Sequence, residues 1–313
     1  MSTTAHQPAD LALRVLKRER RAIAQALSLV EERSAHSGAL LATLAPGFGH
    51  ACVIGLTGPP GAGKSTLVNA MIATLRSGGR RVGVLAVDPS SPLTGGAILG
   101  DQIRMTAALD DDGVMVRSLG ARGALGGLTP AAVRMIDVLD AAGFDDIVME
   151  TVGTGQSEVD IAEIADAVGV VAAPGLGDGI QAMKAGLLEL ADVVIVNKAD
   201  LPGAHRTAEE LGAALAGRAE PRTGLVLQTS AMTGQGVAEV VGALHEAAAR
   251  HRGGGDIIAR RRRRIRYLVA RAAAEIVAQR IKHSAGAELD ALCDQVLAGD
   301  LAPEAAAGRL LSG

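Results

Sequence analysis

The sequence predicts an α/β protein with a doubly wound, mostly parallel sheet, carrying N-terminal and C-terminal helical extensions. Three observations predict this class. Aliphatic runs alternate with helix-like segments from residue 51 to about 230, a glycine-rich loop follows the first run, and the flanking regions show helical spacing only. Near-continuous aliphatic runs are typical of parallel strands that are covered on both faces. The expected strands are 51–57, 82–87, 114–119, 146–151, 168–173, 192–196 and 224–229.

The flanking regions are expected to be helical. Residues 8–35 have amphipathic spacing, and a break at Ser37-Gly38 precedes a short segment near Leu40 to Leu44. Behind Gly236, Gly253-Gly254-Gly255 forms a second break. The expected C-terminal helices are 237–251, Asp256 to about His283, 287–298 and 303–311. The predicted domains are an N-terminal extension (1–48), a nucleotide-binding domain (49–252) and a C-terminal helical arm (253–313).

Composition narrows the function classes. The chain has 313 residues, a net charge of −3 and 48% hydrophobic residues, which is typical of a folded globular protein and gives no case for a nucleic-acid partner. Aromatic residues make up 1%, so base-stacking platforms are scarce. The two cysteines, Cys52 and Cys293, form neither a disulfide framework nor a C-x-x-C site, and Cys52 is expected to be a small buried hydrophobe. With no signal-peptide core and no apolar span, we expect no membrane partner and a cytoplasmic location.

The most informative motif is a phosphate-binding loop of the form G-x-x-x-x-G-K-S between the first expected strand and a helix-like segment. Backbone N–H groups of such a loop point into one concavity, and the helix dipole adds positive potential there. Lys64 is expected to reach the β- and γ-phosphates, and Ser65 to ligate Mg²⁺. The loop consists of Gly58, Pro59, Pro60, Gly61, Ala62, Gly63, Lys64, Ser65 and Thr66.

A second motif, Asn197-Lys198-Ala199-Asp200, directly follows the expected strand 192–196. A carboxylate at Asp200 can accept hydrogen bonds from guanine N1–H and its exocyclic amine, whereas adenine would leave it unpaired. Asn197 is expected to hold the loop, and the Lys198 stem to cover the base. The motif therefore favours GTP and GDP as ligands.

A weaker motif, Ser230-Ala231-Met232, follows the last expected strand. A backbone N–H from this segment could meet guanine O6. Alone, these residues are equally typical of an ordinary loop, so the prediction depends on their position after the Asn197–Asp200 motif.

Glu150-Thr151-Val152-Gly153 closes the expected strand 146–151, at the place where GTPases usually carry D-x-x-G. We expect Glu150 to hold Mg²⁺ and the Gly153 N–H to meet the γ-phosphate. Thr154 occupies the position of the common catalytic glutamine, and Gln156 is a possible substitute. Slow unaided hydrolysis is therefore expected.

Two aspartates follow the expected strand 82–87. Asp88 is placed to bind Mg²⁺ or its water shell, or to orient the attacking water. Asp101 lies further along and is either a metal ligand or a helix N-cap. The expected catalytic group is thus Lys64, Asp88, Glu150 and Gly153, and the expected Mg²⁺ group is Ser65, Asp88, Asp101 and Glu150.

Taken together, these motifs resemble the metallochaperone-type P-loop GTPases, and within them the MeaB/ArgK branch. The stretches that carry the resemblance are GPPGAGKST, VDPSSP, ILGDQIRM, METVGTGQSE, NKAD and Pro174 to Gln181. The resemblance covers roughly residues 10–300. It implies a GTP-gated chaperone that controls adenosylcobalamin loading, protection and reactivation of a cobalamin-dependent acyl-CoA mutase. It also implies a homodimer formed through the C-terminal helices, with an adenosyltransferase as a possible further partner.

The same resemblance implies three mobile segments, about 88–104, 150–157 and 174–184. Gln156, Asp178 and Lys184 lie within them, and Lys184 is implicated in relaying the nucleotide state to the mutase; a solvated helix lysine is the alternative. A γ-phosphate and Mg²⁺ can order such segments, and hydrolysis then releases them. The segments would in this way act as a switch.

The run Arg260 to Arg264 opens the last long helix. A nucleic-acid patch is disfavoured by the acidic net charge, so the arginines either flank a packing seam, bind a partner's carboxylates or form a solvated face. One face of this helix carries apolar residues with the spacing of a packing or dimer seam. These residues are Ile258, Ile265, Val269, Ala272 and Ile276.

Two alternative functions stay open. A metal-delivery GTPase of the nickel or cobalt insertion type needs thiol or imidazole clusters, and here the seven histidines are scattered and the cysteines solitary. A transport ATPase or kinase is disfavoured by the Asn197–Asp200 motif.

Overall fold

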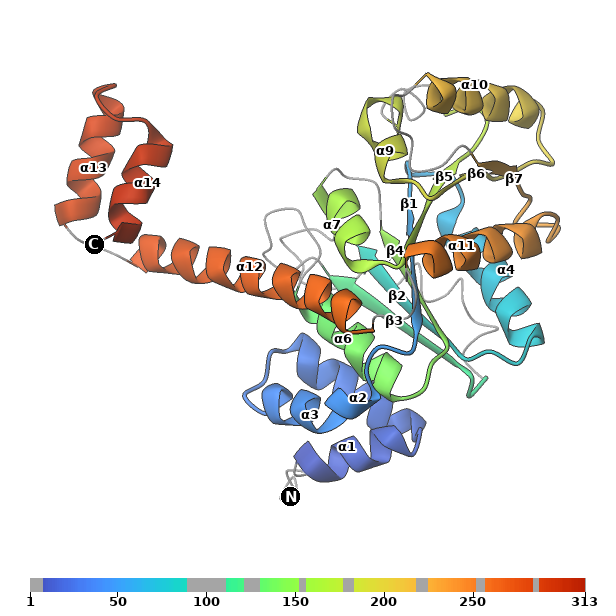
Figure 1. Ribbon diagram of the computed structural model, residues 1–313, viewed down its shortest axis with the longest axis horizontal. Coiled ribbons are helices and arrows are strands. Elements are labelled where there is room, and N and C mark those ends of the chain that lie inside the picture. Colours follow the sequence, from blue (N-terminus) through green and yellow to red (C-terminus); the bar gives the residue numbers. More distant parts are fainter. Residues whose placement is uncertain are drawn as a thin grey trace. The chain divides into compact units, whose positions relative to one another are not determined.

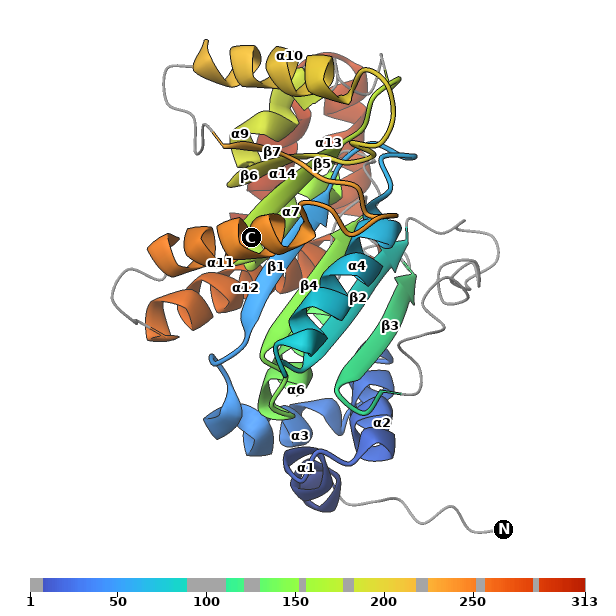
Figure 2. The ribbon, with the colours of Figure 1, turned by 90° about the vertical axis from the view of Figure 1, so that its right-hand side faces the viewer.

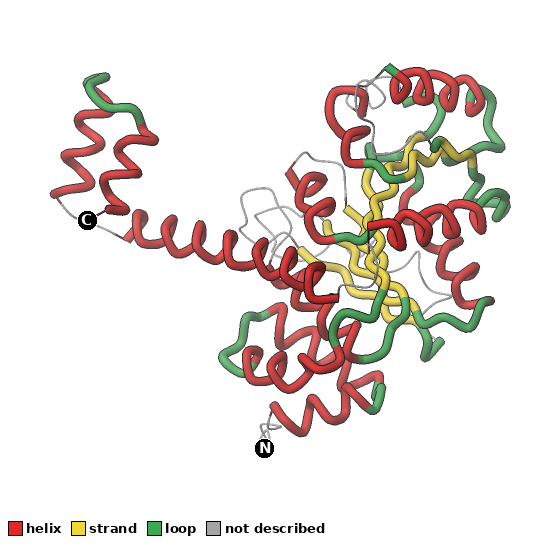
Figure 3. The backbone as a smooth tube through the Cα atoms, in the orientation of Figure 1, coloured by secondary structure: helices red, strands yellow, loops and turns green. Residues whose placement is uncertain are grey.

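The computed structural model describes residues 8–88, 111–120, 130–151, 156–176, 183–217, 225–251, 257–283 and 287–312. The chain forms two compact units, Met1–Arg264 and Ile265–Gly313. The first unit contains the N-terminal helices and the sheet, and the second contains most of the last long helix and the two helices that follow (Figures 1 and 3).

The core of the first unit is a seven-stranded sheet in the order β3-β2-β4-β1-β5-β6-β7, and every pairing is parallel. Figure 2 shows the strands side by side beneath α4 and α11. The predicted fold class is confirmed, because each expected strand is present within two residues of its expected ends. The strands are β1 (Cys52–Thr57), β2 (Val82–Asp88), β3 (Val114–Gly120), β4 (Asp146–Thr151), β5 (Ala167–Ala172), β6 (Val193–Val196) and β7 (Val226–Gln228).

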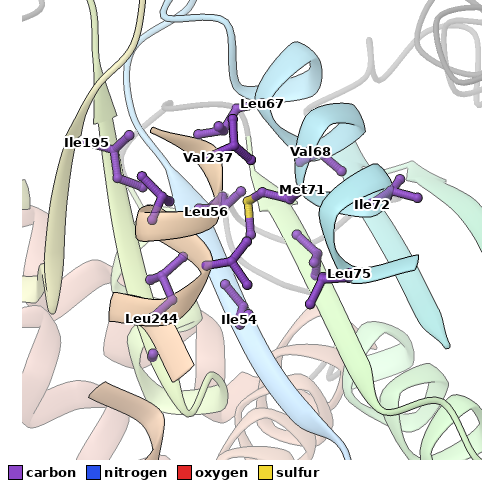
Figure 4. Packing of buried hydrophobic residues seen from close by; sticks show 14 of the residues in the cluster. Ile54, Leu56, Leu67, Val68, Met71, Ile72, Leu75, Ile195, Val237 and Leu244 are labelled. Atoms are coloured by element: carbon purple, nitrogen blue, oxygen red, sulfur yellow. The ribbon is translucent and has the colours of Figure 1, made fainter. Parts of the chain in front are cut away.

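Helices cover both faces of the sheet. Alternate residues of β1 point to opposite faces, so Ile54 and Leu56 pack against α4 and α11 (Figure 4), whereas Gly55 faces Ile161 and Ala165 beside α7. The helices of this region are α4 (Lys64–Ser77), α6 (Pro130–Ala141), α7 (Gln156–Ile164), α9 (Leu188–Leu190) after one π-helical turn (Met183–Leu187), α10 (Ala204–Ala216) and α11 (Val237–His251).

The N-terminal extension differs from its sequence prediction in two places. Residues 8–35 form two helices rather than one, because the chain turns at Arg18, whose φ is 64°. The predicted break lies slightly earlier, at residues 32–36, and Ser37-Gly38 begins the third helix. The helices are α1 (Pro8–Leu16), α2 (Arg20–Glu31) and α3 (Ser37–Leu44), followed by a 3₁₀ turn (Ala45–Gly47). Both α2 and α3 contact α6, so the extension packs on the sheet domain.

The C-terminal helices begin and end within one residue of their predicted bounds. They are α12 (Ile257–His283), α13 (Ala287–Leu297) and α14 (Pro303–Ser312). None of the described helices has both the length and the apolar character that a bilayer-spanning segment requires.

Three arginines of the run at the start of α12 contact other parts of the chain, which differs from the solvated face and the partner-binding group that the sequence allowed. Arg263 donates to Ala165 O at 2.7 Å and Arg264 to Ile164 O at 2.9 Å. Arg261 lies over the Phe48 ring, 5.2 Å from its centroid. These side chains therefore bind the carbonyl end of α7 and a loop before β1, while Arg262 is exposed.

Candidate nucleotide-binding site

The phosphate-binding loop connects β1 to α4, and two of its glycines are required by its backbone. Gly58 has φ +141°, and a Cβ there would collide with the carbonyl of Val171. Gly63 has φ +84°, and a Cβ there would meet the side-chain amide of Asn197. The left-handed conformation and the close approach both exclude larger residues. As a result, the loop curls tightly over β1, and Lys64, Ser65 and Thr66 begin α4.

Lys64 is 6% exposed, and its ammonium is held over the loop. Its Nζ donates to Gly58 O at 2.8 Å and to Pro59 O at 3.1 Å. The helix N-terminus directs its backbone N–H groups to the same side, which concentrates positive potential above the loop. This arrangement suits a polyphosphate.

Ser65 and Glu150 meet at the carboxyl edge of the sheet. The Ser65 hydroxyl donates to Glu150 Oε1 at 2.7 Å, and Glu150 is 4% exposed. Asp88 ends the adjacent strand, where Ala86 pairs in register with Glu150. The side chain of Asp88, and all of Asp101 and Gly153, lie outside the described residues. Two of the four predicted Mg²⁺ ligands are thus in direct contact.

Asn197 joins the phosphate-binding loop to the predicted base-binding loops. It is 2% exposed, and its Nδ2 donates to Ala62 O at 3.0 Å and to Gly63 O at 3.2 Å. Its Oδ1 accepts from the Ala231 N–H at 3.1 Å. One buried side chain therefore fixes the distance between two loops that lie far apart in the sequence.

Asp200 and Ser230 are also brought together. The Ser230 hydroxyl donates to Asp200 Oδ1 at 2.5 Å; Ser230 is fully buried and Asp200 is exposed. Lys198 has φ +60°, in the left-handed region, which turns the chain sharply between Asn197 and Asp200. Met232 is 80% exposed beside this pair. The carboxylate is thus oriented by a neighbour and stays open to a ligand.

The predicted partner-facing residues are only partly visible. Gln156 begins α7 and Lys184 lies in the π-helical turn, but their side chains, and all of Asp178, are outside the described residues. Sequence reasoning did not anticipate that Ser230 pairs with Gln235, or that the Thr229 hydroxyl donates to Gln235 O. No local motif signals these contacts, because they depend on how the loop closes on itself.

A parallel sheet with a phosphate-binding loop after its central strand, an N-K-x-D motif after β6 and a short loop after β7 defines a P-loop GTPase. Residues 23–286 match the family described as Methylmalonyl Co-A mutase-associated GTPase MeaB. The chain belongs to this family, as its sequence motifs predicted. It is therefore a GTPase that binds GTP and GDP.

Relatives and a solved structure agree with this assignment. A "putative GTPase" of Pyrococcus horikoshii is 44% identical over 311 residues, which cover 97% of this chain and 98% of the relative. A "probable GTPase" of Mycobacterium tuberculosis is 43% identical, over 77% of this chain and 74% of the relative. A crystal structure described as an "LAO/AO transport system kinase" has a TM-score of 0.77 at 25% identity and covers 100% of both chains.

Proposed function

We propose that this GTPase is a chaperone of a cobalamin-dependent acyl-CoA mutase, and that its nucleotide state gates adenosylcobalamin loading, protection and reactivation. The family's name associates its members with methylmalonyl-CoA mutase. The structural observation that carries a gating role is the placement of α7, which follows Glu150 after a short connection. A change at the γ-phosphate edge would thus act on one end of α7, while Arg263 and Arg264 of α12 bind its other end.

Mg²⁺ is proposed to bind at Ser65 and Glu150. A hydroxyl and a carboxylate oxygen 2.7 Å apart form a hard-oxygen donor set, which Mg²⁺ prefers. Asp88 and Asp101 are proposed to complete the site directly or through water. When bound, the ion would neutralise charge on the β- and γ-phosphates. The protein's own part is to orient these donors and to hold Lys64 above the loop.

Asp200 is proposed to select guanine, with its carboxylate accepting from N1–H and the exocyclic amine. The contact from Ser230 supports this role, because it fixes the orientation of the carboxylate before a base arrives. Comparing the affinities of GDP, IDP and ADP tests the assignment, since inosine lacks only the exocyclic amine. Asp200→Ala should bring the GDP and IDP affinities close together, and tighter binding of ADP than GDP by the wild type would contradict it.

The mutase partnership is tested by co-purification and by reactivation of damaged holo-mutase with GTP or GDP. Lys64→Ala is the matched control, because it removes the phosphate-binding ammonium and leaves the surface unchanged. The proposal fails if the protein neither binds a cobalamin-domain mutase nor changes its reactivation. An adenosyltransferase can be added to the same assay, and cell fractionation checks the predicted cytoplasmic location.

A homodimer through the C-terminal helices is also proposed. Ile265, Val269 and Ile276 on α12 are 51%, 62% and 65% exposed, as expected of a seam that a second chain covers. In the same unit, α13, α14 and the end of α12 line an apolar groove of about 460 Å³. Light scattering should give a dimer for the wild type and a monomer for Ile265→Glu/Val269→Glu. A monomeric wild type would refute the proposal.

A metal-delivery role is the alternative function, and the structure contains a group of candidate metal ligands for it. Among the described residues, Cys52, Asp146 and His245 bring their ligand atoms within 4.8 Å of one another, although the sequence suggested no such cluster. However, Asp146 already accepts from Arg80 and His245 at 2.5 and 2.7 Å, and an arginine repels a cation. This cluster therefore fits a structural ion-pair network better. Stoichiometric nickel or cobalt binding would favour delivery instead.

A further inference from the structure

A second pocket lies at the edge of the sheet opposite the nucleotide site. It has a volume of about 540 Å³, and four arginines line it: Arg18, Arg20, Arg76 and Arg81. Arg81 directly precedes β2, whereas the phosphate-binding loop follows the carboxyl end of β1. Because the strands are parallel, these positions belong to opposite edges. The pocket is therefore separate from the GTP site.

The N-terminal extension builds one wall of this pocket. Arg18 lies in the turn between α1 and α2, and Arg20 begins α2; Arg20 Nη1 donates to Asp111 O and Val114 O, both at 2.9 Å. These bonds attach the extension to the amino end of β3. Arg76, near the end of α4, and Arg81 supply the opposite wall.

The carboxylates around the pocket do not balance its arginines. Asp111 is occupied by a two-bond contact with Arg76, at 2.8 and 2.9 Å. Asp112 lines the pocket, and Asp145 accepts from the backbone N–H of Arg81 rather than from its guanidinium. Within the described part of the chain, no ion pair joins Arg18 or Arg81 to a carboxylate. The described residues that line the pocket thus hold four guanidinium groups and one carboxylate, that of Asp112.

Arg18 and Arg81 also converge on the same backbone segment. Arg81 Nη1 donates to Ala142 O at 2.7 Å and lies 3.4 Å from Gly143 O. A Cβ on Gly143 would lie 2.9 Å from Arg18 Nη2, so Arg18 packs directly against that glycine. Burial, and next the nearby Arg18, lower the pKa of Arg81. The carboxylates of Asp145 and Asp112 act in the opposite direction on the pKa of Arg81, and a bound anion would reduce the repulsion that remains between the two guanidinium groups.

The left-handed backbone of Arg18 follows from its place just after the end of α1. Its φ of 64° lies in the left-handed region, where glycine or asparagine is the usual residue. The Arg18 N–H donates to Val15 O at 2.8 Å and the Glu19 N–H donates to Arg14 O at 3.1 Å, which is the hydrogen-bonding pattern that ends a helix with a left-handed residue.

From these observations we infer that this pocket binds a phosphate-bearing small anion, with Arg18 and Arg81 as its principal contacts. Guanidinium groups match phosphate oxygens through paired hydrogen bonds. The volume suits a small-molecule ligand rather than a single ion. Arg81 lies over the Phe144 ring, 4.5 Å from its centroid, and Ile23 and Met115 supply an apolar part of the lining against which a group attached to the phosphate can pack. The ligand is thus either a free phosphate or diphosphate, or a nucleotide that carries one.

Calorimetric titration of the full-length protein tests this inference. The protein carries one equivalent of GDP, so that the phosphate-binding loop is filled and no excess GDP competes for the pocket. The probes are inorganic phosphate, pyrophosphate and ADP at low salt, each in matched Mg²⁺. The test variants are Arg18→Ala/Arg81→Ala and Arg18→Ala, and Arg21→Ala, which removes an exposed arginine on α2 outside the pocket, is the control that matches the single variant in charge.

We expect one pyrophosphate site in the wild type, weakened at least about tenfold in the double variant and unchanged in Arg21→Ala, because each charge-assisted bond contributes a comparable factor. Tighter ADP binding than pyrophosphate binding would assign the apolar lining to a nucleoside, and the reverse would assign a free phosphate. The inference is overturned if no probe binds the wild type, or if the double variant binds equally well. If the double variant fails to fold, Arg18→Ala alone decides, since Arg18 is exposed and has no ion pair among the described residues.

Discussion

Replacing Asn197 with alanine should uncouple the phosphate-binding loop from the base-binding loops. The side chain makes three hydrogen bonds at 3.0 to 3.2 Å, two to the carbonyls of Ala62 and Gly63 and one from the Ala231 N–H. A neutral hydrogen bond contributes about 1 kcal/mol net, so the change removes up to about 3 kcal/mol. Asn197 is 2% exposed, so water cannot easily replace it without rearrangement.

That free energy is expected to appear mainly in nucleotide affinity. GDP bound as proposed would contact both loops at once, so in the variant its binding would have to order loops that the side chain holds in place in the wild type. A loss of 1.4 to 3 kcal/mol corresponds to a Kd for GDP that is about 10- to 150-fold higher. Fluorescent GDP titration measures this Kd, and thermal melting of the nucleotide-free protein measures the remaining effect on stability.

Arg206→Ala is the control, because Arg206 forms only an exposed pair with Glu210 on α10. It should leave both quantities unchanged. If Asn197→Ala binds GDP within threefold of the wild type and melts at the same temperature, the coupling argument is wrong. If it melts earlier but binds GDP normally, Asn197 supports the scaffold alone.

Three further predictions concern the proposed metal site, a partly buried carboxyl and the attachment of α12. Ser65→Ala should raise the Mg²⁺ concentration needed for half-maximal GTP hydrolysis by about tenfold, since it removes a proposed ligand, and an unchanged Mg²⁺ titration would contradict the assignment. Burial raises the pKa of Asp137 to about 6 in the folded protein, from about 3.8 in the unfolded chain. The protonated carboxyl therefore contributes its whole stabilisation of the fold below about pH 3.8, and this stabilisation is lost as the pH rises through about 6. Asp137→Asn should therefore stabilise the fold by about 1–3 kcal/mol at pH 7.5 and by almost nothing at pH 4, as measured by urea unfolding; equal gains at both pH values would disprove the burial argument. Arg264→Ala should cost about 2–4 kcal/mol in the same assay, because Arg264 is 4% exposed and binds Ile164 O and Asp166, whereas the exposed Arg262→Ala should cost little.

The strands and the C-terminal helices were predictable because their signals are local. Aliphatic runs such as 146–151 are long enough to identify a buried strand, and glycine breaks mark the end of α11. The N-terminal region was harder, because amphipathic spacing continues across Arg18 although the backbone reverses there. A left-handed arginine carries no sequence signal, since glycine and asparagine are the residues associated with such turns.

In the candidate site, too, some features could be predicted from local sequence and others depend on tertiary contacts. Contiguous motifs identified the phosphate-binding loop and the Asn197–Asp200 segment, because phosphate and guanine each need particular groups at fixed spacing. The contacts of the arginine run could not be predicted, since Arg263 and Arg264 donate to backbone carbonyls about 100 residues away in the sequence. Any exposed helix terminus offers such carbonyls, so sequence cannot choose among them.

The sequence by itself therefore determined the fold class, the ligand class and the family, because these depend on local periodicity and on contiguous motifs. Only the tertiary structure decided that Ser65 meets Glu150, that Asn197 joins two distant loops, and that Arg18 and Arg81 share a pocket. Those contacts join segments from different strands and helices. Their geometry follows from strand order and helix packing. Strand order and helix packing depend on interactions along the whole chain, so no single segment encodes them.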